Sequence, residues 1–547
     1  MRSKRSTKRG AVLGMALMTG VLGLVVPAAA PAAAAPAAAP AAVAPIEWGE
    51  CAAEDLANVP PDQRDKFSCG NYAVPLNHER PRQGTINIAL MKRAANDQAN
   101  RVGAVFLNPG GPGGSGYLWP TTRRLVGPIQ DRFDLIGFDP RGVGRSTPLR
   151  CFATDEDAAD VFGRMHPLPV TSAQETATLK ANKDYGKFCK RFAGPLINHM
   201  STEDVAQDLD MLRAAAGEDK LNYIGFSYGT LLGATYVNMF PKKSRAIILD
   251  GNVDPTLRLL DGVEYDRQRT KGFEIALDAF LTECDSVGEA CAFSGDARGK
   301  WDALLNYLRN TGPVTLPDGT VVDEALLVGF TASALYDPAS FTDLAAAIQS
   351  VWEASHPSAQ RAAAPADTAA VKQLIASAGK ATRDAPPDAP YTSDDSYAAV
   401  NCSDKPFNNT QAEMPGIADR WERQMRSFGR YLAWGDPALC PTWPVKQPDA
   451  YRGPWNTRTP NPVLVVGNYY DPATQYEFAK RMSKQLGNAR LVSVDSFGHC
   501  ILGDSACVDK IAADYMVDLK VPGPGSVCYP DVRPFDPAAE AKTALGS

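Results

Sequence analysis

A serine between two glycines is the residue whose surroundings most clearly predict chemistry. Residues 220–230 have the sequence KLNYIGFSYGT, in which a short apolar run leads into Gly225-x-Ser227-x-Gly229 and a helix-like pattern follows. A strand, a tight turn and a helix in this order form a nucleophile elbow, where a side chain at either glycine position would collide with the strand or the helix. The five-residue pattern is common on its own, so its meaning depends on the other groups that a serine nucleophile requires.

A histidine and a carboxylate follow the elbow at suitable places in the sequence. A serine hydroxyl needs a base to become a nucleophile, and that base needs an acid that orients it. Of the five histidines, His499 alone follows a buried strand after the elbow, and Asp471 follows the apolar run at 462–467. Hydrolases with a G-x-S-x-G elbow have the chain order serine, aspartate, histidine, so we predict Ser227 as nucleophile, His499 as base and Asp471 as orienting acid. Asp254 is the rival acid, with a structural role in a turn as its alternative.

A glycine-rich segment at the end of an earlier strand predicts an oxyanion hole. Residues 103–107 form a continuous apolar run, and NPGGPGGSG follows at 108–116. A phosphate-binding loop is the alternative, but the segment lacks the G-K-[ST] ending, and no G-x-G-x-x-G motif with an acidic partner follows. Beside a serine elbow, such glycines let backbone N–H groups approach a developing oxyanion. We expect the N–H groups of Gly111 and Tyr228 to bind the oxyanion while Ser227 forms an acyl-enzyme that water then hydrolyses.

Strands alternate with helices around these motifs. Residues 72–76 and 85–90 predict paired strands around a polar turn. Further buried strands are predicted at 133–138, 246–250, 462–467 and 489–494. A helix should begin at Ser201, because Ser201-x-x-Asp204 resembles a capping box. Buried strands that alternate with helices form parallel sheets, so we predict an α/β fold with a mostly parallel sheet and helices on both faces. Together with the elbow at Ser227, this pattern is typical of the α/β-hydrolase fold.

A long helical block interrupts this alternation. Residues 255–455 are mainly amphipathic helix, with a small hairpin expected at 314–322 and a flexible, Ala/Pro/Asp-rich excursion at 356–397. We interpret the block as a cap domain inserted into the hydrolase core. The core then consists of a first part at 45–254 and a second part at 456–547, which ends in a tail that bears a disulfide.

The first 44 residues predict export from the cell. A basic stretch is followed by an apolar run at 11–26 and by an Ala/Pro tract with several A-x-A sites, the pattern of a signal peptide and a spacer or pro-region. A membrane anchor is the alternative, but the apolar run is short and no charged flank follows it. We expect a secreted protein without stable membrane association after signal removal. The formal charge of −6 and the lack of a basic stripe argue against nucleic acid as a partner.

Eleven cysteines in an exported chain predict disulfides. Spacing does not define connectivity, but cysteines that neighbour each other in the sequence suggest five pairs. These pairs are Cys51–Cys69, Cys151–Cys189, Cys284–Cys291, Cys402–Cys440 and Cys507–Cys528. The odd count leaves one thiol, which we expect at Cys500. Zinc ligation is the alternative, but the sequence has no C-x-x-C pair, so we expect no metal and no other cofactor.

Together the motifs resemble the prolyl-aminopeptidase branch of the α/β-hydrolases, and within it the secreted actinomycete tripeptidyl aminopeptidases. The resemblance rests on Pro109-Gly110-Gly111-Pro112-Gly113, Asp139-x-Arg141-Gly142-x-Gly144-x-Ser146, Gly225-x-Ser227-Tyr228-Gly229, Asp471-Pro472-Ala473-Thr474, Gly498-His499 and the tail Cys507…Pro522-x-x-Gly525-x-x-Cys528. Two positions depart from the family pattern. Pro109 replaces the usual histidine before the glycines, and Cys500 follows the base where simple relatives often have glycine. Asp139 and Arg141 are expected to pair with each other and brace the loop behind the site.

The resemblance implies a serine peptidase that removes short peptides, tripeptides in particular, from the free N-terminus of a peptide or protein. Such an activity needs a carboxylate that binds the substrate's ammonium group and a cap that limits the depth of the site. The candidate carboxylates in the cap are Glu264, Glu274 and Asp404. A secreted carboxylesterase or lipase is the alternative, because the same triad serves both kinds of acyl group. A non-catalytic binding module is disfavoured because all three triad residues are present. The sequence does not define the oligomeric state.

Overall fold

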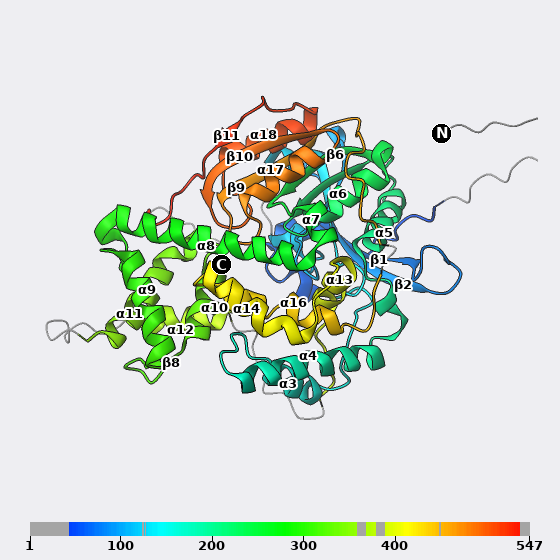
Figure 1. Ribbon diagram of the computed structural model, residues 1–547. Coiled ribbons are helices and arrows are strands. Elements are labelled where there is room, and N and C mark those ends of the chain that lie inside the picture. The colour runs from blue at the N-terminus through cyan, green and yellow to red at the C-terminus, as the bar shows by residue number, and fades with distance from the viewer. Residues whose placement is uncertain are drawn as a thin grey trace, which may run out of the picture. The chain divides into compact units, whose positions relative to one another are not determined.

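The computed structural model describes residues 43–122, 125, 127–357, 368–378, 389–447 and 450–536. Its centre is a nine-stranded sheet in the order β1-β2-β4-β3-β5-β6-β9-β10-β11 (Figure 1). From β4 to β11 neighbouring strands pair in parallel, whereas β2 pairs antiparallel with both β1 and β4. This mostly parallel sheet confirms the predicted fold class. The predicted export segment, residues 1–44, lies outside the described residues apart from its last two.

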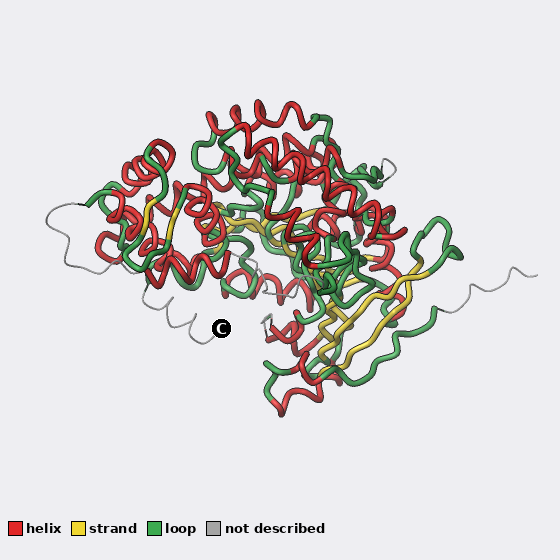
Figure 2. The backbone as a smooth tube through the Cα atoms, turned by 90° about the horizontal axis from the view of Figure 1, so that it is seen from below, coloured by secondary structure: helices red, strands yellow, loops and turns green. Residues whose placement is uncertain are grey.

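The strands of the sheet lie at or near their predicted places, except for β11, which the sequence analysis did not predict. Their bounds are β1 Phe67–Pro75, β2 Thr85–Arg93, β3 Gly103–Asn108, β4 Phe133–Phe138, β5 Leu221–Phe226, β6 Ser244–Asp250, β9 Val463–Tyr470, β10 Ala489–Phe497 and β11 Val527–Cys528. Every residue of β3, β4 and β5 is buried, as expected for parallel strands covered on both faces. The antiparallel β1–β2 pair projects beyond the helices at one end of the sheet (Figure 2).

Helices cover both faces of the sheet. Packed on one face are α5 (Thr202–Ala215), α6 (Gly229–Met239) and α17 (Tyr476–Gln485), and on the other α2 (Gly127–Arg132) and α18 (Ala506–Asp518). In β3, Ala104 and Phe106 belong to the first hydrophobic core, while Val105 and Leu107 belong to the second. This division follows because successive side chains of a strand point to opposite faces. A short helix, α1 (Trp119–Thr122), follows the glycine-rich loop.

A helical cap is inserted between β6 and β9. Its helices are α7 Pro255–Leu260, α8 Gly262–Val287, α9 Ala297–Asn310, α10 Glu324–Ala334, α11 Phe341–Ser355, α12 Thr368–Ala378, α13 Ser396–Asp404, α14 Met414–Gln424, α15 Gly429–Ala433 and α16 Asp436–Leu439. The predicted hairpin is present as β7 (Val314–Thr315) paired with β8 (Val321–Val322). None of the helices in the described ranges is long and apolar enough to cross a bilayer.

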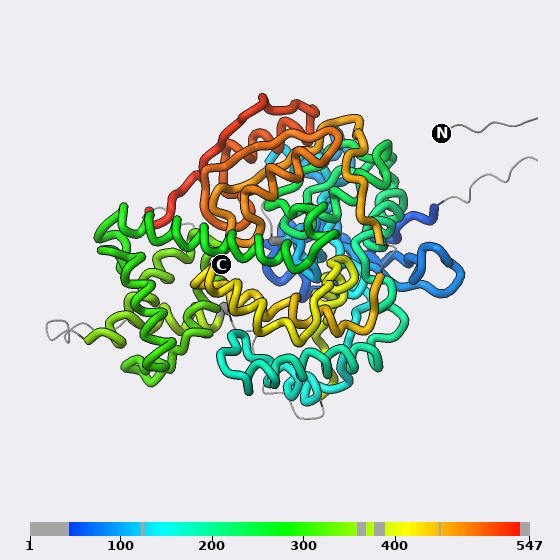
Figure 3. Tube along the Cα trace, viewed as in Figure 1, coloured from blue at the N-terminus to red at the C-terminus, as the bar shows by residue number. Residues whose placement is uncertain are grey.

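The long helix α8 runs from the hydrolase core into the helical part of the cap (Figure 3). Its C-terminal half contributes Phe273, Leu277 and Phe280 to a hydrophobic core shared with α9, α10 and α11. Its N-terminal half lies against the hydrolase core, where Tyr265 stacks on Phe478 of α17 with ring centroids 5.2 Å apart. The cap therefore has a core of its own, and a continuous helix carries it to the site.

A second helical excursion lies between β4 and α5, where the sequence analysis made no prediction. It consists of α3 (Asp155–Gly163) and α4 (Ser172–Phe192), and the Cys151–Cys189 disulfide ties its two ends together. Figure 1 shows both helices along the lower edge of the cap. The Arg430 guanidinium of the cap lies 3.2 Å from the carboxylate of Glu175 in α4, so this excursion contacts the cap through an ion pair.

One local prediction is confirmed and another needs correction. The Ser201–Asp204 capping box is present at the start of α5. The excursion at 356–397 contains a helix at 368–378, whose Val371 and Leu374 are buried in the cap core, so it is not flexible throughout. Residues 358–367 and 379–388 of that stretch lie outside the described residues.

Candidate active site

Ser227 lies on a strained corner between β5 and α6. Its φ angle is 54°, a left-handed conformation that non-glycine residues rarely adopt, and its N–H donates to the carbonyl oxygen of Asp250 at 2.9 Å. A Cβ atom on Gly225 would lie 2.4 Å from the carbonyl oxygen of Gly229, and one on Gly229 would lie 2.7 Å from the carbonyl oxygen of Asn108. Both glycines are therefore required by close backbone contacts, as a nucleophile elbow demands.

The glycine-rich loop passes directly over this corner. Gly110 has a φ of +93°, and a Cβ atom there would lie 2.4 Å from the carbonyl oxygen of Phe226 and 2.8 Å from the nitrogen of Tyr228. Gly111, the next residue, lines the same pocket as Ser227 and Tyr228. The loop thus lies against the elbow, and Gly111 lines the pocket beside Ser227.

Asp139 braces this loop, but not through Arg141 as the sequence analysis expected. Its carboxylate accepts from the Ser115 hydroxyl at 2.6 Å, the Tyr117 N–H at 3.1 Å and the Arg145 N–H at 2.8 Å. The Arg141 guanidinium instead binds Asp208 of α5 at 2.7 Å. The expected Asp139–Arg141 pair is wrong because the side chain of Arg141 reaches a carboxylate that is far away in the sequence.

Asp471 and His499 form a buried hydrogen-bonded pair. The Nδ1 atom of His499 lies 2.9 and 3.0 Å from the two carboxylate oxygens of Asp471, which is 2% exposed. The same carboxylate accepts from the N–H groups of Ala473 at 2.9 Å and Thr474 at 2.7 Å and from the Thr474 hydroxyl at 2.8 Å. With Nδ1–H donating to Asp471, the Nε2 atom of His499 is free to act as the base.

The environment of His499 favours its protonated form. Burial alone would lower the pKa of the imidazole, but the adjacent Asp471 carboxylate outweighs that effect and raises the pKa well above the ordinary histidine value. The Tyr336 ring packs edge-on against the imidazole with a centroid distance of 5.2 Å, and the Tyr336 carbonyl accepts the His499 backbone N–H at 2.8 Å. Cap and core therefore both hold the ring in place.

The rival acid, Asp254, has a structural role. It caps the N-terminus of α7 by accepting from the Leu257 N–H at 3.1 Å, and its other oxygen lies 3.3 Å from Arg481. The structure thus places Asp254 in the turn that the sequence analysis named as its alternative role, away from the residues that line the pocket with Ser227.

Ser227 and His499 line a pocket of about 340 Å³, and residues of the cap line the same pocket. The lining residues are Pro109, Gly111, Ser227, Tyr228, Val253, Arg258, Tyr265, Asp266, Arg269, Tyr336, Tyr397, Asn401, Lys405, Ala473, Thr474 and His499. The core supplies the reactive end, and α7, α8 and α13 of the cap supply the opposite wall. The cap also touches the catalytic loops, since a Cβ on Gly272 of α8 would lie 2.7 Å from the carbonyl oxygen of Pro472.

None of the three carboxylates predicted to bind the substrate's ammonium lines this pocket. Glu264 pairs with Arg267 at 2.7 Å, and Glu274 accepts two backbone N–H groups at 2.8 Å. Asp404 accepts from the N–H of Thr202 at 2.9 Å and from its hydroxyl. Their carboxylates are therefore engaged elsewhere in the fold. Among the described residues that line the pocket, the one carboxylate is Asp266.

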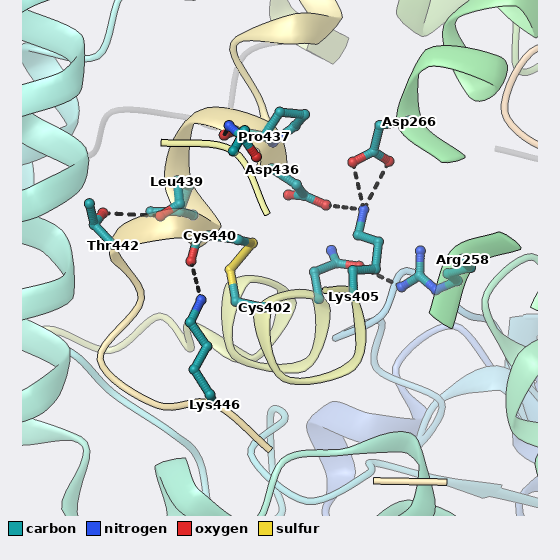
Figure 4. Close-up of a disulfide and its surroundings, with 12 residues drawn as sticks. Arg258, Asp266, Cys402, Lys405, Asp436, Pro437, Leu439, Cys440, Thr442 and Lys446 are labelled. Carbon is teal, nitrogen blue, oxygen red and sulfur yellow. Dashed lines mark hydrogen bonds and ion pairs between the residues drawn. A yellow bond between two sulfur atoms is a disulfide. The ribbon is translucent and has the colours of Figure 1, made fainter. Parts of the chain in front are cut away.

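Asp266 belongs to a buried charge cluster with Lys405 and Asp436 (Figure 4), and both Asp266 and Lys405 line the pocket. The Lys405 ammonium lies 2.9 Å from Asp266 and 2.5 Å from Asp436, and all three side chains are less than a tenth exposed. The Cys402–Cys440 disulfide fastens the helix that carries Lys405 to the segment that follows Asp436. Two carboxylates share one lysine here, and the side chain of Arg269 lines the same pocket as Asp266.

All five predicted disulfides are present, and Cys500 is the remaining thiol; the eleven cysteines all lie within the described residues. Five disulfides are typical of a protein that matures in an oxidising compartment. Cys500 follows the proposed base directly, and burial raises the pKa of its thiol. A thiol kept protonated beside the histidine does not compete with Ser227 as a nucleophile.

Comparisons with known proteins agree with this architecture. Residues 103–295 match the α/β-hydrolase fold family, and residues 424–528 match the family described as TAP-like protein. The protein is therefore an α/β-hydrolase, of the class that uses a serine nucleophile.

Three relatives narrow the class further. The tripeptidyl aminopeptidase of Streptomyces lividans is 30% identical over 90% of this chain and 88% of its own length. The serine protease Hip1 of Mycobacterium tuberculosis is 29% identical over 88% of this chain and 91% of its own length. Carboxylesterase B of Mycobacterium tuberculosis is 30% identical over 96% and 99%. The chain belongs to the tripeptidyl aminopeptidase family of α/β-hydrolases.

Proposed function

We propose that this protein is a secreted serine exopeptidase that releases tripeptides from free N-termini through an acyl-enzyme on Ser227. The observation that carries the proposal is the pocket itself, which is lined by Ser227 and His499 of the hydrolase core and by cap helices that include the Asp266 carboxylate. Its volume of about 340 Å³ lies near the lower end of the range of about 300–1,000 Å³ for small-ligand sites. Such a pocket suits a short peptide end better than the middle of a long chain.

In the proposed mechanism, the Ser227 hydroxyl attacks the carbonyl carbon at the end of the third residue while His499 Nε2 takes its proton. Asp471 holds the imidazole and stabilises the imidazolium that forms. The backbone N–H groups of Gly111 and Tyr228 bind the oxyanion. The imidazolium then protonates the leaving amine, and water activated by His499 releases the acyl group and restores the serine.

Asp266 is the carboxylate that we propose for the substrate's ammonium, in place of the three predicted from sequence. It lines the catalytic pocket and also an adjoining cavity of about 310 Å³, which Asp436 borders as well. Asp266 and Asp436 share the single ammonium of Lys405, and a carboxylate can accept several hydrogen bonds, so Asp266 can also accept from the ammonium of a substrate. This arrangement supports recognition of a free N-terminus at the cap end.

Secretion is proposed from two independent features. The N-terminal sequence has the basic, apolar and A-x-A regions of a signal peptide. The five disulfides lie in both the hydrolase core and the cap, which favours folding outside the reducing cytoplasm. Cleavage of the segment can be checked by N-terminal sequencing of the protein from culture medium.

A carboxylesterase remains the second candidate function, because one relative of similar identity carries that name and the same triad would cleave esters. A substrate panel separates the two functions. It contains tripeptide 4-nitroanilides with free and acetylated N-termini, and 4-nitrophenyl esters of short acids. Turnover of the free-amine tripeptides alone among the anilides supports the exopeptidase. Activity on acetylated peptides and esters without activity on free-amine tripeptides would contradict it.

A further inference from the structure

The pocket holds two arginines that have no carboxylate partner within the described part of the chain. Arg258 of α7 and Arg269 of α8 both line the catalytic pocket, yet neither forms an ion pair within 4 Å among the described residues. The contact of Arg269 with the Tyr336 hydroxyl is long, at 3.5 Å. The nearby carboxylates are engaged, since Asp266 binds Lys405 and Asp404 binds Thr202.

Arg258 is the more informative of the two. Its side chain is 4% exposed, and its Nε–H is buried without a hydrogen-bond acceptor. Its guanidinium carbon lies 5.7 Å from the ring centroid of Tyr228, the residue after the nucleophile, and 5.3 Å from that of Tyr265. Aromatic faces stabilise a guanidinium partly, but a buried charge without an anion is costly. The free donor therefore indicates a missing acceptor in the pocket that Arg258 shares with Ser227.

Asn401 supplies a second free donor at the same place. Its Oδ1 atom accepts from Arg258 Nη2 at 2.5 Å, which fixes the orientation of the amide. The Nδ2 group then has no partner, although the side chain is 1% exposed and the residue lines the pocket. Two adjacent buried donors, together with Arg269 on the same pocket, present hydrogen-bond donors and positive charge to a ligand.

We propose that Arg258, Asn401 and Arg269 form a subsite for a carboxylate in the acyl part of the substrate. The enzyme would then prefer peptides whose released portion carries an aspartate or a glutamate. A peptide carbonyl would accept from one of these donors, whereas a carboxylate has two oxygens that can accept from both and forms stronger, charge-assisted hydrogen bonds with a guanidinium. This inference rests on the proposed peptidase function and adds the chemistry of the side chain that the pocket selects.

Matched tripeptide 4-nitroanilides with a free N-terminus test the subsite. Aspartate or asparagine is placed in turn at each of the three positions, with alanine at the other two, and kcat/KM is measured for each pair. The wild-type protein is expected to favour aspartate at one position by at least about tenfold, the effect of one charge-assisted hydrogen bond. A ratio at or below one at all three positions overturns the proposal.

Variants assign the preference to the proposed residues. In Arg258→Met the ratio should fall to about one, and Asn401→Asp should lower it as well, because the new carboxylate would pair with Arg258. Arg267→Met is the matched control, since Arg267 pairs with Glu264 outside the pocket, and it should keep the wild-type ratio. The ratio compares two substrates in one protein sample, so a loss of folded protein does not change it. An unchanged ratio in Arg258→Met overturns the assignment.

An ester pair separates failure of the subsite from failure of the peptidase proposal. If no tripeptide is turned over, 4-nitrophenyl hemisuccinate is compared with 4-nitrophenyl butyrate, which has the same chain length without the carboxylate. A preference for the hemisuccinate that disappears in Arg258→Met supports the subsite on an esterase. No preference for the hemisuccinate overturns it.

Discussion

Replacement of Asp471 by asparagine tests the proposed acid through the tautomer of His499. Both backbone N–H groups that Asp471 accepts, from Ala473 and Thr474, bind the same oxygen, Oδ1, which an asparagine retains. The amide NH₂ replaces Oδ2, the oxygen 2.9 Å from His499 Nδ1. Although Oδ1 lies 3.0 Å from Nδ1 and stays an acceptor, it already accepts two backbone N–H groups. The amide donor at the shorter distance therefore favours the tautomer in which Nδ1 accepts and Nε2 carries the ring proton. The imidazole then keeps its place but has no lone pair for the proton of Ser227.

The expected loss is large in kcat and small in KM. The same change in another serine–histidine–aspartate enzyme lowers kcat roughly 10⁴-fold. That factor corresponds to about 5.5 kcal/mol of activation free energy. Asp471 does not line the pocket, so substrate binding should change little. The thermal unfolding midpoint should stay near the wild-type value because the loop keeps its backbone hydrogen bonds.

Steady-state kinetics on the best substrate of the panel measure this effect. Asp254→Asn is the matched control, because asparagine caps a helix as well as aspartate does, and its kcat should stay near the wild-type value. If Asp471→Asn retains more than about a tenth of wild-type kcat, less than 1.4 kcal/mol has been lost and the proposed role of Asp471 is refuted. A loss in Asp254→Asn as deep as that in Asp471→Asn would refute it as well.

Three further predictions concern the base, the oxyanion loop and a buried acid. His499 must be neutral to accept a proton, and the Asp471 carboxylate raises the pKa of its imidazole. We therefore expect kcat/KM to fall on acidification with a midpoint above about pH 6.5, and a midpoint below this pH contradicts the prediction. Gly110→Ala should abolish turnover while the protein stays folded, since its Cβ would displace the loop from the elbow; near-normal kcat would show that the loop is not needed. Burial raises the pKa of Asp395 to about 6, so the folded state binds the extra proton and the free energy of unfolding falls as pH rises from about 4 to 6. Asp395→Asn should remove that fall, which is roughly 2 kcal/mol between pH 4 and 6 for a shift of about two units, and denaturant titrations at both pH values measure it.

The positions of the proposed triad could be predicted from sequence because each depends on local patterns. Glycines around Ser227 and an apolar strand before Asp471 are visible in a few residues, and the structure places Asp471 and His499 in hydrogen-bond contact. The parallel sheet was predictable for the same reason, since its central strands are continuous apolar runs. The roles of these residues remain predictions until the variants are measured.

Local sequence patterns could not predict which cap residues line the pocket. Glu264 and Asp266 are two positions apart in α8, so they lie on different sides of the helix. Which side meets the pocket depends on how α8 docks, and the close contact of Gly272 with the loop that follows Asp471 helps to fix this. The free donors of Arg258 and Asn401 likewise arise from two cap helices that meet only in the folded protein.

Product analysis on one peptide tests the central claim most directly. An octapeptide with a free N-terminus and its acetylated counterpart are incubated with the wild-type protein and with Ser227→Ala, and the products are identified by mass spectrometry over time. We predict that the wild-type protein releases the N-terminal tripeptide from the free octapeptide and leaves the acetylated octapeptide intact. The Ser227→Ala variant should cleave neither peptide and form no acyl-enzyme. Cleavage of the acetylated peptide, or full activity without the serine, would contradict the proposed exopeptidase.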